Sequence, residues 1–388
     1  MIKDLVLSQV YNAVKEKTIK VSIKTEKGVF SACAPSGTSA GEYEAKRLDV
    51  KTIVKNFPET KKNFIGKSED AVDNIIEGVG IGKLGANLSI ALSIAAVRAL
   101  SKNNAYQFFN KKARTFPFPL GNAIGGGAHK GYTSEQEFLI LPVKSKSIKE
   151  AVKANQSIWN DVGKLIKSKG ILMGNNFEGA WMCKLNDLET LDMLSRISEN
   201  YGTRIGIDFA SSQFYRDGKY CYINPEKKLS PEEQFEFVLG LIRTYRLVYV
   251  EDPFHENDFE HFSELTKKVN CLVTGDDLFV TQSERLKMGI RKKAGNAIII
   301  KPDQVGLVSK ALETIKIAKK ANYKTVVSHR SRDTTDSFIA DLALGTSSPV
   351  IKCGIHGKER TSKLNRLIGL WSKVEKPEMA KLNFLSVI

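Results

Sequence analysis

The chain has 388 residues, of which 42% are hydrophobic, so it can bury a sizeable core in two domains. No apolar run reaches the roughly 18 residues of a membrane span, and the N-terminus lacks a signal-peptide pattern, so we predict a cytoplasmic protein. The cysteines are odd in number and far apart, which argues against a disulfide framework or a zinc site; they are Cys33, Cys183, Cys221, Cys271 and Cys353.

Lysine and arginine outnumber aspartate and glutamate by 59 to 43, which gives a formal net charge of +16. Such a charge first suggests nucleic-acid binding. The basic residues, however, are spread along the expected helices without interleaved aromatics, and no nucleic-acid-binding motif accompanies them. We therefore expect a solvated basic surface that attracts small anions, and no nucleic acid as a partner.

The N-terminal part of the chain mixes strand and helix patterns. The expected elements are a hairpin of strands 18–25 and 29–34, and helices over 68–78 and 85–102. A charged, proline-containing segment, 110–119, follows these helices. We place a domain boundary there, with an α+β N-terminal domain over 1–113 and a second domain over 114–388.

The rest of the chain alternates strands with helices at short, regular spacing. Ser230 and Glu233 have a capping-box pattern that begins an amphipathic helix. The expected elements are strand 138–143, helices 147–169 and 186–201, strand 204–210, hairpin 215–223, helix 230–246, strand–helix units 247–270, 271–294, 297–323 and 324–345, strand 350–353 and helix 358–373. About eight such units in one domain predict a parallel sheet closed into a (β/α) barrel.

Carboxylates end several of the predicted strands. Asp208, Glu251 and Asp276 follow three successive apolar runs. The carboxyl ends of barrel strands meet at one face, so these side chains should point into one cavity, where their negative charges repel. A divalent cation relieves that repulsion, and an all-oxygen ligand set favours Mg²⁺ or Mn²⁺ over zinc.

Lys301 ends the next predicted strand. A lysine that removes a proton must be neutral part of the time, although its reference pKa is about 10.4. Burial beside metal cations can lower that pKa by about 3 units. Carboxylate-bound cations beside such a lysine suit removal of a proton next to a substrate carboxylate, because the developing charge falls on the metal.

A group of anion-binding side chains follows strand 324–328. Arg330 can hold a phosphate or carboxylate through two parallel hydrogen bonds, and the hydroxyl of Ser331 adds a donor. His329 precedes them, and Lys363 on the last helix could add positive charge. The glycine-rich segment 125–129 lacks the Gly-Lys-Ser/Thr of a phosphate-binding loop.

Eight segments together resemble enolase, in a divergent, archaeal-like form. They are 35–45 (Pro-Ser-Gly-Thr-Ser-Ala-Gly-Glu-Tyr-Glu-Ala), 136–138 (Gln-Glu-Phe), 208–215 (Asp-Phe-Ala-Ser-Ser-Gln-Phe-Tyr), 251–254 (Glu-Asp-Pro-Phe), 275–278 (Gly-Asp-Asp-Leu), 301–306 (Lys-Pro-Asp-Gln-Val-Gly), 328–331 (Ser-His-Arg-Ser) and 363–367 (Lys-Leu-Asn-Arg-Leu). The resemblance implies an enolase-type (β/α)8 barrel with irregular first units, preceded by a smaller α+β capping domain. The implied reaction is the reversible dehydration of 2-phosphoglycerate to phosphoenolpyruvate in glycolysis and gluconeogenesis; this superfamily is itself the standard example of a base working with Mg²⁺.

The resemblance also implies roles for individual residues. Lys301 matches the base and Glu178 the acid, while Asp208, Glu251, Asp276 and, on the first loop, Ser39 match the ligands of two Mg²⁺ ions. The substrate-binding positions matched are His129, Gln136, Glu137, Arg330, Ser331 and Lys363. The family commonly forms dimers or octamers, which implies a homo-oligomer.

Two alternatives stay open at this point. One is a dehydratase or racemase that acts on another carboxylate with the same scaffold. The other is an enolase-like protein that has lost catalysis and serves as a binding protein. Retention of Lys301 together with three carboxylates favours an enzyme.

Overall fold

The computed structural model describes residues 1–37, 43–129 and 131–382 of the chain, apart from the side chain of His129. Its N-terminal part contains a three-stranded antiparallel sheet formed by β1 (Asp4–Tyr11), β2 (Lys17–Thr25) and β3 (Gly28–Cys33). The predicted hairpin is confirmed, because Thr25 pairs with Gly28 across the turn. Strand β1 was not predicted. It is an edge strand with Val6 and Tyr11 exposed, so its sequence carries little alternation.

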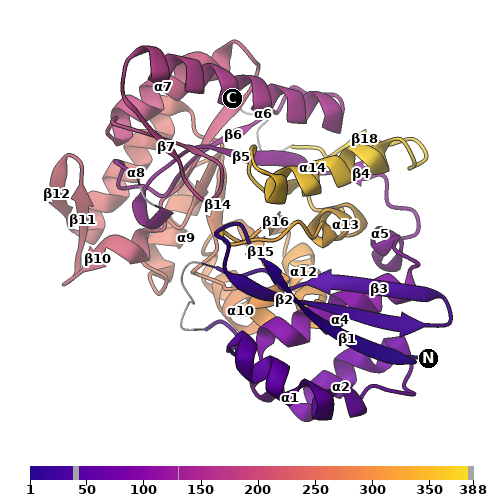
Figure 1. Ribbon diagram of the computed structural model, residues 1–388. Helices are drawn as coiled ribbons and strands as arrows, with labels where there is room; N and C mark the ends of the chain where they lie inside the picture. The colour runs from indigo at the N-terminus through magenta and orange to yellow at the C-terminus, as the bar shows by residue number, and fades with distance from the viewer. Residues whose placement is uncertain (38–42, 130, 383–388) are drawn as a thin grey trace.

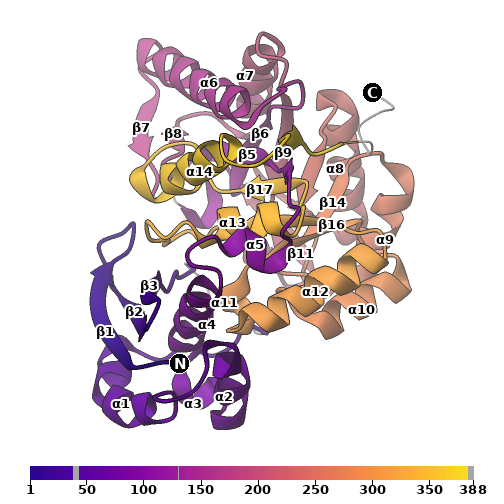
Figure 2. The same cartoon turned by 90° about the vertical axis from the view of Figure 1, so that its right-hand side faces the viewer.

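Helices cover one face of this sheet (Figures 1 and 2). They are α1 (Val50–Lys62), the 3₁₀ turn η1 (Glu69–Ala71), α2 (Val72–Val79), α3 (Ile81–Leu84) and α4 (Ala86–Leu100). The next helix, α5 (Ala105–Phe109), packs instead on the barrel helix α13 (Phe338–Gly345). Helix α4 is buried almost all round, since it packs on β2 and β3 and also on the barrel helix α11 (Pro302–Val305). Helix α1 was not predicted, and Pro58 in its interior explains why the pattern was missed.

Eight strands close into a barrel, which confirms the predicted fold. They are β5 (Phe118–Gly125), β6 (Glu137–Leu141), β9 (Arg204–Asp208), β13 (Tyr249–Glu251), β14 (Leu272–Gly275), β15 (Ala297–Ile300), β16 (Lys324–Ser328) and β17 (Val350–Lys352). Pairing of β17 with β5 closes the ring. The expectation of a parallel sheet is wrong at one strand, because β6 runs antiparallel to both neighbours.

Strand β5 was also missed from the sequence. It is buried along its whole length, yet it contains Pro119, Gly121 and Asn122, which are poor strand formers. Backbone pairing with β17 on one side and β6 on the other stabilises the strand despite that weak local preference. The alternating residues of the barrel strands form an apolar cluster that includes Leu139, Tyr249 and Ile299.

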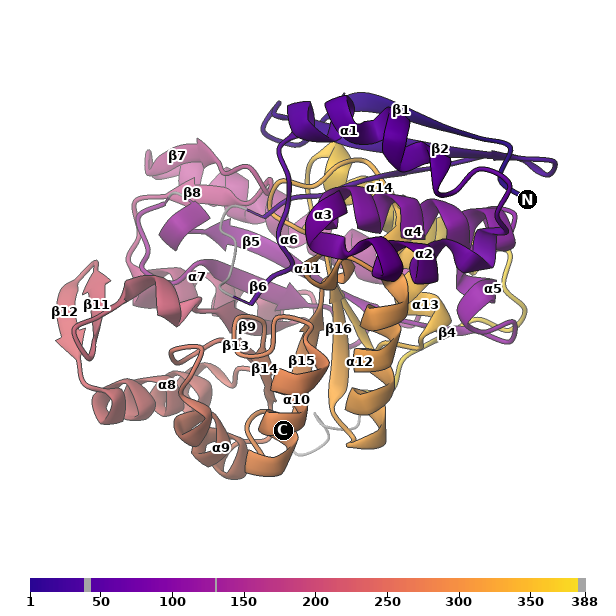
Figure 3. The ribbon, with the colours of Figure 1, turned by 90° about the horizontal axis from the view of Figure 1, so that it is seen from below.

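The remaining elements surround the barrel (Figure 3). The further strands are β4 (Thr115–Phe116), β7 (Leu172–Asn175), β8 (Trp181–Cys183), β10 (Tyr215–Arg216), β11 (Lys219–Ile223), β12 (Glu226–Leu229) and β18 (Glu378–Met379). The further helices are η2 (Gly127–His129), α6 (Ile148–Ser168), α7 (Asp187–Glu199), η3 (Ser211–Phe214), α8 (Pro231–Tyr245), α9 (Phe259–Lys268), α10 (Ser283–Lys292), α12 (Val308–Lys320), α13 (Phe338–Gly345) and α14 (Lys358–Trp371). Helix α8 begins with the predicted capping box of Ser230 and Glu233.

The N-terminal part lies against one side of the barrel, and its sheet reaches the barrel mouth (Figure 1). Ser36, just after β3, forms a two-way backbone bridge with Arg332, at 3.2 and 2.9 Å between nitrogen and oxygen. The predicted boundary at 113/114 falls between α5 and β4 and stays a prediction. Within the described ranges, no helix is both long and apolar enough to cross a membrane.

Candidate active site

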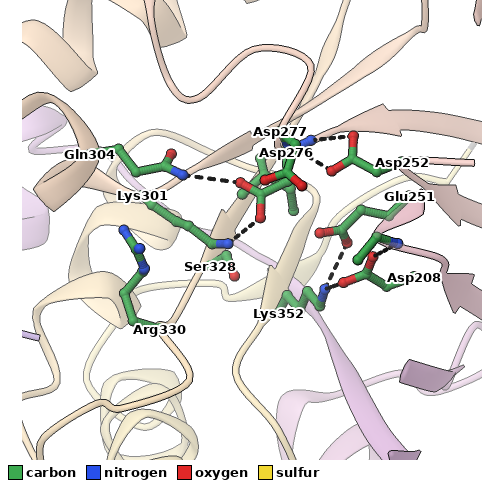
Figure 4. Close-up of polar contacts among 12 residues, drawn as sticks. Asp208, Glu251, Asp252, Asp276, Asp277, Lys301, Gln304, Ser328, Arg330 and Lys352 are labelled. Atoms are coloured by element: carbon green, nitrogen blue, oxygen red, sulfur yellow. Dashed lines mark hydrogen bonds and ion pairs between the residues drawn. The ribbon is translucent and has the colours of Figure 1, made fainter. Parts of the chain in front are cut away.

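A polar cavity lies at the carboxyl ends of the barrel strands. Its wall includes Asp208, Asp276, Lys301, Arg330 and Lys352, together with Gly37 and Glu44 from the N-terminal part of the chain. The strand-end residues therefore meet in one place, as the sequence predicted. Figure 4 shows the charged side chains pointing toward one another from neighbouring strands.

Three carboxylates surround the ammonium group of Lys352, which lines this cavity. Its Nζ lies 2.8 Å from Asp208 Oδ2, 2.8 Å from Glu251 Oε2 and 3.2 Å from Glu137 Oε2. Asp208 and Glu251 come together because they pair directly across β9 and β13. Glu137 joins them because β6 is antiparallel, which brings its first residue to the barrel face where the other strands end. Burial acts to lower the pKa of Lys352, but Asp208 and the other carboxylates outweigh it and raise that pKa well above its usual value.

Lys301 is paired with Asp276 at the next strand end. Its Nζ donates to Asp276 Oδ2, and Gln304 Nε2 donates to Asp276 Oδ1 at 3.2 Å. Burial tends to lower the pKa of Lys301, yet Asp276 reverses this and the pKa is raised. The sequence predicted a lowered pKa beside metal cations. Among the described residues the direction is opposite, because the negative charge of Asp276 favours the charged form of the lysine.

The carboxylates fit a divalent cation. Oε1 of Glu251 is buried and has no hydrogen-bond partner in the described part of the chain. Burial, followed by the repulsion of Asp208, raises the pKa of Glu251 to about 8. Asp208, Glu251 and Asp276 supply the all-oxygen donors that Mg²⁺ prefers.

A second carboxylate group overlaps this set at Asp276. Ligand oxygens of Asp252, Asp276 and Asp277 lie within 4.8 Å of one another. Asp252, however, accepts the backbone N–H groups of Asp276 at 3.1 Å and Asp277 at 2.7 Å, one on each oxygen. Because both of its oxygens hold the backbone after β14, Asp252 serves mainly to orient Asp276.

The predicted acid, Glu178, lies in a tight turn over residues 176–179, which we call the acid turn. The side chain of Asn176 accepts the backbone N–H groups of Glu178 and Ala180, both at 3.0 Å, and so fixes the turn. The side chain of Glu178 is 2% exposed. Its carboxylate accepts a hydrogen bond from Asn122 Nδ2 at 3.3 Å and lies 3.9 Å from His329 Nε2. Glu178 and His329 line the same cavity as Lys301.

Gln136 links the carboxylate of Asp208 to Gln213 on η3 through hydrogen bonds of its amide group. Its Nε2 donates to Asp208 Oδ2 at 3.2 Å, and its Oε1 accepts from Gln213 Nε2 at 3.0 Å. Burial, followed by the nearby Glu178, raises the pKa of Glu137 well above its usual value. Both Gln136 and Glu137 line the cavity, as predicted.

Arg330 is buried between two carboxylates. Its NH1 donates to Asp303 Oδ2 at 2.8 Å, and its NH2 donates to both oxygens of Glu44, at 2.9 and 3.1 Å. Ser331 lines the cavity beside it. An incoming anion that binds Arg330 therefore has to replace Glu44, which is the contact from the N-terminal part of the chain.

Lys363 does not reach this cavity. Its Nζ donates to Thr334 O at 2.5 Å, lies 3.3 Å from Asp333 Oδ2 and faces a neighbouring, more apolar cavity. The lysine that the sequence reasoning missed is Lys352. It could have been found by the strand-end rule itself, because Lys352 is the last residue of β17, whereas Lys363 is a helical residue. Two further predicted positions, Ser39 and the side chain of His129, lie outside the described residues.

Comparisons with known proteins agree with this geometry. Residues 112–378 match the sequence model of "Enolase, C-terminal TIM barrel domain". The enolase of Archaeoglobus fulgidus is 36% identical over 98% of this chain and 100% of its own length. The chain belongs to the enolase family. The enolases of Haloarcula marismortui (39% identical, 95% of this chain and 98% of the relative) and Methanosphaera stadtmanae (37% identical, 98% and 99%) span it almost completely as well. All three relatives are archaeal, which agrees with the archaeal-like resemblance predicted from the sequence.

Proposed function

We propose that the chain catalyses the reversible dehydration of 2-phosphoglycerate to phosphoenolpyruvate, the enolase reaction of glycolysis and gluconeogenesis, in the cytoplasm. The observation that carries this proposal is one cavity lined by Lys301, Asp208, Asp276 and Arg330, with the buried Glu251 joined to it through Lys352. Base, carboxylates and anion-binding arginine are the parts that this reaction needs. A binding protein has no use for two lysines, Lys301 and the buried Lys352, that are paired with these carboxylates.

Lys301 is the residue we assign as the base. It takes the proton from C2 of the substrate, and for this it must first be neutral. Its ion pair with Asp276 opposes the neutral form, so cations held by Asp208, Glu251 and Asp276 and, for a second ion, by Ser39 fit the need. When bound, Mg²⁺ ions, two per site, supply positive charge to the substrate carboxylate.

Glu178 is the residue we assign as the acid. It gives its proton to the C3 hydroxyl, which leaves as water, while the electron pair of the broken C2–H bond forms the new double bond. Arg330 and Ser331 hold the phosphate after Glu44 has moved away from the guanidinium group. We assign the substrate carboxylate to Lys352 in place of Lys363, because Lys352 lines the cavity. Gln136, Glu137 and His129 complete the substrate contacts.

The test is a turnover assay with the purified chain, 2-phosphoglycerate and Mg²⁺. We expect phosphoenolpyruvate to form, formation to stop when EDTA removes the metal, and added Mg²⁺ to restore it. Folded, Mg²⁺-saturated protein without turnover would contradict the proposal. Faster turnover of another 2-hydroxy or sugar acid would favour the dehydratase or racemase alternative. Light scattering tests the homo-oligomer, dimer or octamer, that we propose by analogy with the family.

A further inference from the structure

Arg360 is a buried arginine that the proposed mechanism does not use. It lies in the first turn of α14 and is 1% exposed. Its NH1 lies 2.8 Å from His329 Nδ1 and donates to Arg330 O at 2.8 Å. Its NH2 donates to Ser331 O at 2.5 Å and to Phe177 O at 3.2 Å. In the described part of the chain, all of its hydrogen bonds go to neutral acceptors, which is unusual for a buried charge.

The contact with His329 decides which ring nitrogen carries the proton. A guanidinium group has only donors, so Nδ1 of His329 has to accept the hydrogen bond. The ring is therefore neutral, with its hydrogen on Nε2. That nitrogen faces Glu178 Oε1 at 3.9 Å, inside the cavity. In this arrangement, His329 offers an N–H group to the cavity and no acceptor.

The other contacts of Arg360 join two loops that are far apart in sequence. Phe177 belongs to the acid turn, and Arg330 and Ser331 belong to the anion-binding segment after β16. The acid turn also packs closely on the loop before α14. A Cβ atom added at Gly179 would lie 2.2 Å from His356 O, so this position requires glycine. Arg360 therefore connects the acid turn directly to the anion-binding segment.

We propose that Arg360 is a positioning residue for the proposed reaction. It holds His329 as a neutral imidazole with its hydrogen on Nε2, and it fixes the acid turn relative to residues 330–331. The inference rests on the proposed function only in treating Glu178 and Arg330 as residues that contact substrate.

The charges around His329 support the neutral ring. Arg360, Lys352 and Lys363 from the β17–α14 region face it, and Glu178 faces it from the acid turn. Burial first, and then Arg360, lower the pKa of His329 well below its usual value; Glu178 acts in the other direction without reversing the shift.

The direct test is nitrogen NMR of the histidine rings in the intact protein, with the His329 signal assigned from its absence in His329→Asn. We expect wild-type His329 to stay neutral with its hydrogen on Nε2 from pH 8 to about pH 5. In Arg360→Met, its pKa should rise by about 1 unit or more, and both tautomers should appear. A wild-type ring with its hydrogen on Nδ1 would overturn the proposal, and this measurement needs no variant of Arg360 to fold. An Arg360→Met ring unchanged in tautomer and pKa would overturn it too.

Kinetics provide a second test. In Arg360→Lys, a single ammonium cannot reach all four acceptors, so we expect kcat to fall by about 100-fold while KM for 2-phosphoglycerate changes much less. Arg366→Gln is the matched control, because Arg366 lies on the same helix but pairs with Asp341. It should leave kcat and the His329 signals unchanged. An Arg360→Lys enzyme with wild-type kcat would overturn the positioning role. If the wild-type chain shows no turnover, the proposed function fails while the NMR test still decides this proposal.

Discussion

Two parts of one cavity hold buried carboxylates in opposite ways. In the lysine–carboxylate cluster, which comprises Asp208, Glu251, Asp276, Lys301 and Lys352, each carboxylate lies within an ion pair. In the acid turn, Glu178 instead meets the amide of Asn122 and the neutral ring of His329. The first arrangement pairs carboxylates with ammonium groups that a cation can replace, whereas the second suits a group that delivers a proton. The same type of side chain serves two tasks because its neighbours differ.

The largest expected effect comes from removing the base of the cluster. In Lys301→Ala, we expect kcat to fall by about 10⁴-fold. Lys352, the other lysine that lines the cavity among the described residues, is surrounded by three carboxylates and cannot replace the base. The measurement is phosphoenolpyruvate formation at saturating Mg²⁺. Lys310→Ala, a half-exposed lysine of α12 paired with Glu77, is the control and should keep full activity. Activity retained in Lys301→Ala would remove Lys301 from the role of base.

A second substitution removes the ammonium group of Lys352 at the centre of the cluster. In Lys352→Met without divalent cations, we expect a loss of about 3–5 kcal/mol in the free energy of unfolding, because buried carboxylates lose their partner. Mg²⁺ should recover part of this loss, since it binds the same carboxylates. Denaturant unfolding with and without Mg²⁺ measures both quantities.

Lys363→Met is the matched control for that experiment. Lys363 is equally buried and paired with Asp333, but it lies outside the cluster. Its loss of stability should be the same with and without Mg²⁺. Equal Mg²⁺ dependence in the two variants would show that the cluster does not bind the metal.

The acid turn should respond differently. In Glu178→Gln, we expect kcat to fall by about 100-fold with little change in the free energy of unfolding, since glutamine keeps an oxygen that accepts from Asn122. Steady-state kinetics and denaturant unfolding together make this test. A large loss of stability would mean that the turn depends on a charged Glu178, which would remove the contrast with the cluster.

The smallest expected effect is a pH dependence of stability that comes from His329. Its pKa is lowered in the folded state, so between that value and about 6.5 the unfolded chain binds more protons. Stability should therefore fall as the pH drops below about 6.5, by about 1.4 kcal/mol per pH unit from this group. His329→Asn should show a shallower pH dependence than the wild type in denaturant unfolding. Identical slopes would mean that folding does not lower the pKa of His329.

Much of the cluster could be predicted from the sequence. Asp208, Glu251, Asp276 and Lys301 each follow an apolar run, and a barrel brings the ends of such runs to one face whatever the details of packing. For the acid turn, only the resemblance to the enolase family pointed to Glu178. Lys352 also ends an apolar strand, although the family resemblance pointed to Lys363. Both lie near the last strand, and only the three-dimensional arrangement shows which ammonium group the carboxylates surround.

The sequence by itself determined the barrel, because the alternation of apolar strands and amphipathic helices is a local pattern that each segment carries alone. It also determined the chemistry of the strand ends. Only the tertiary structure decided the reversal of β6, the burial of β5 despite its proline and glycine, and the contacts of Arg360 with two distant loops. Each of these depends on partners that lie far away along the chain, and local patterns contain no information about such partners.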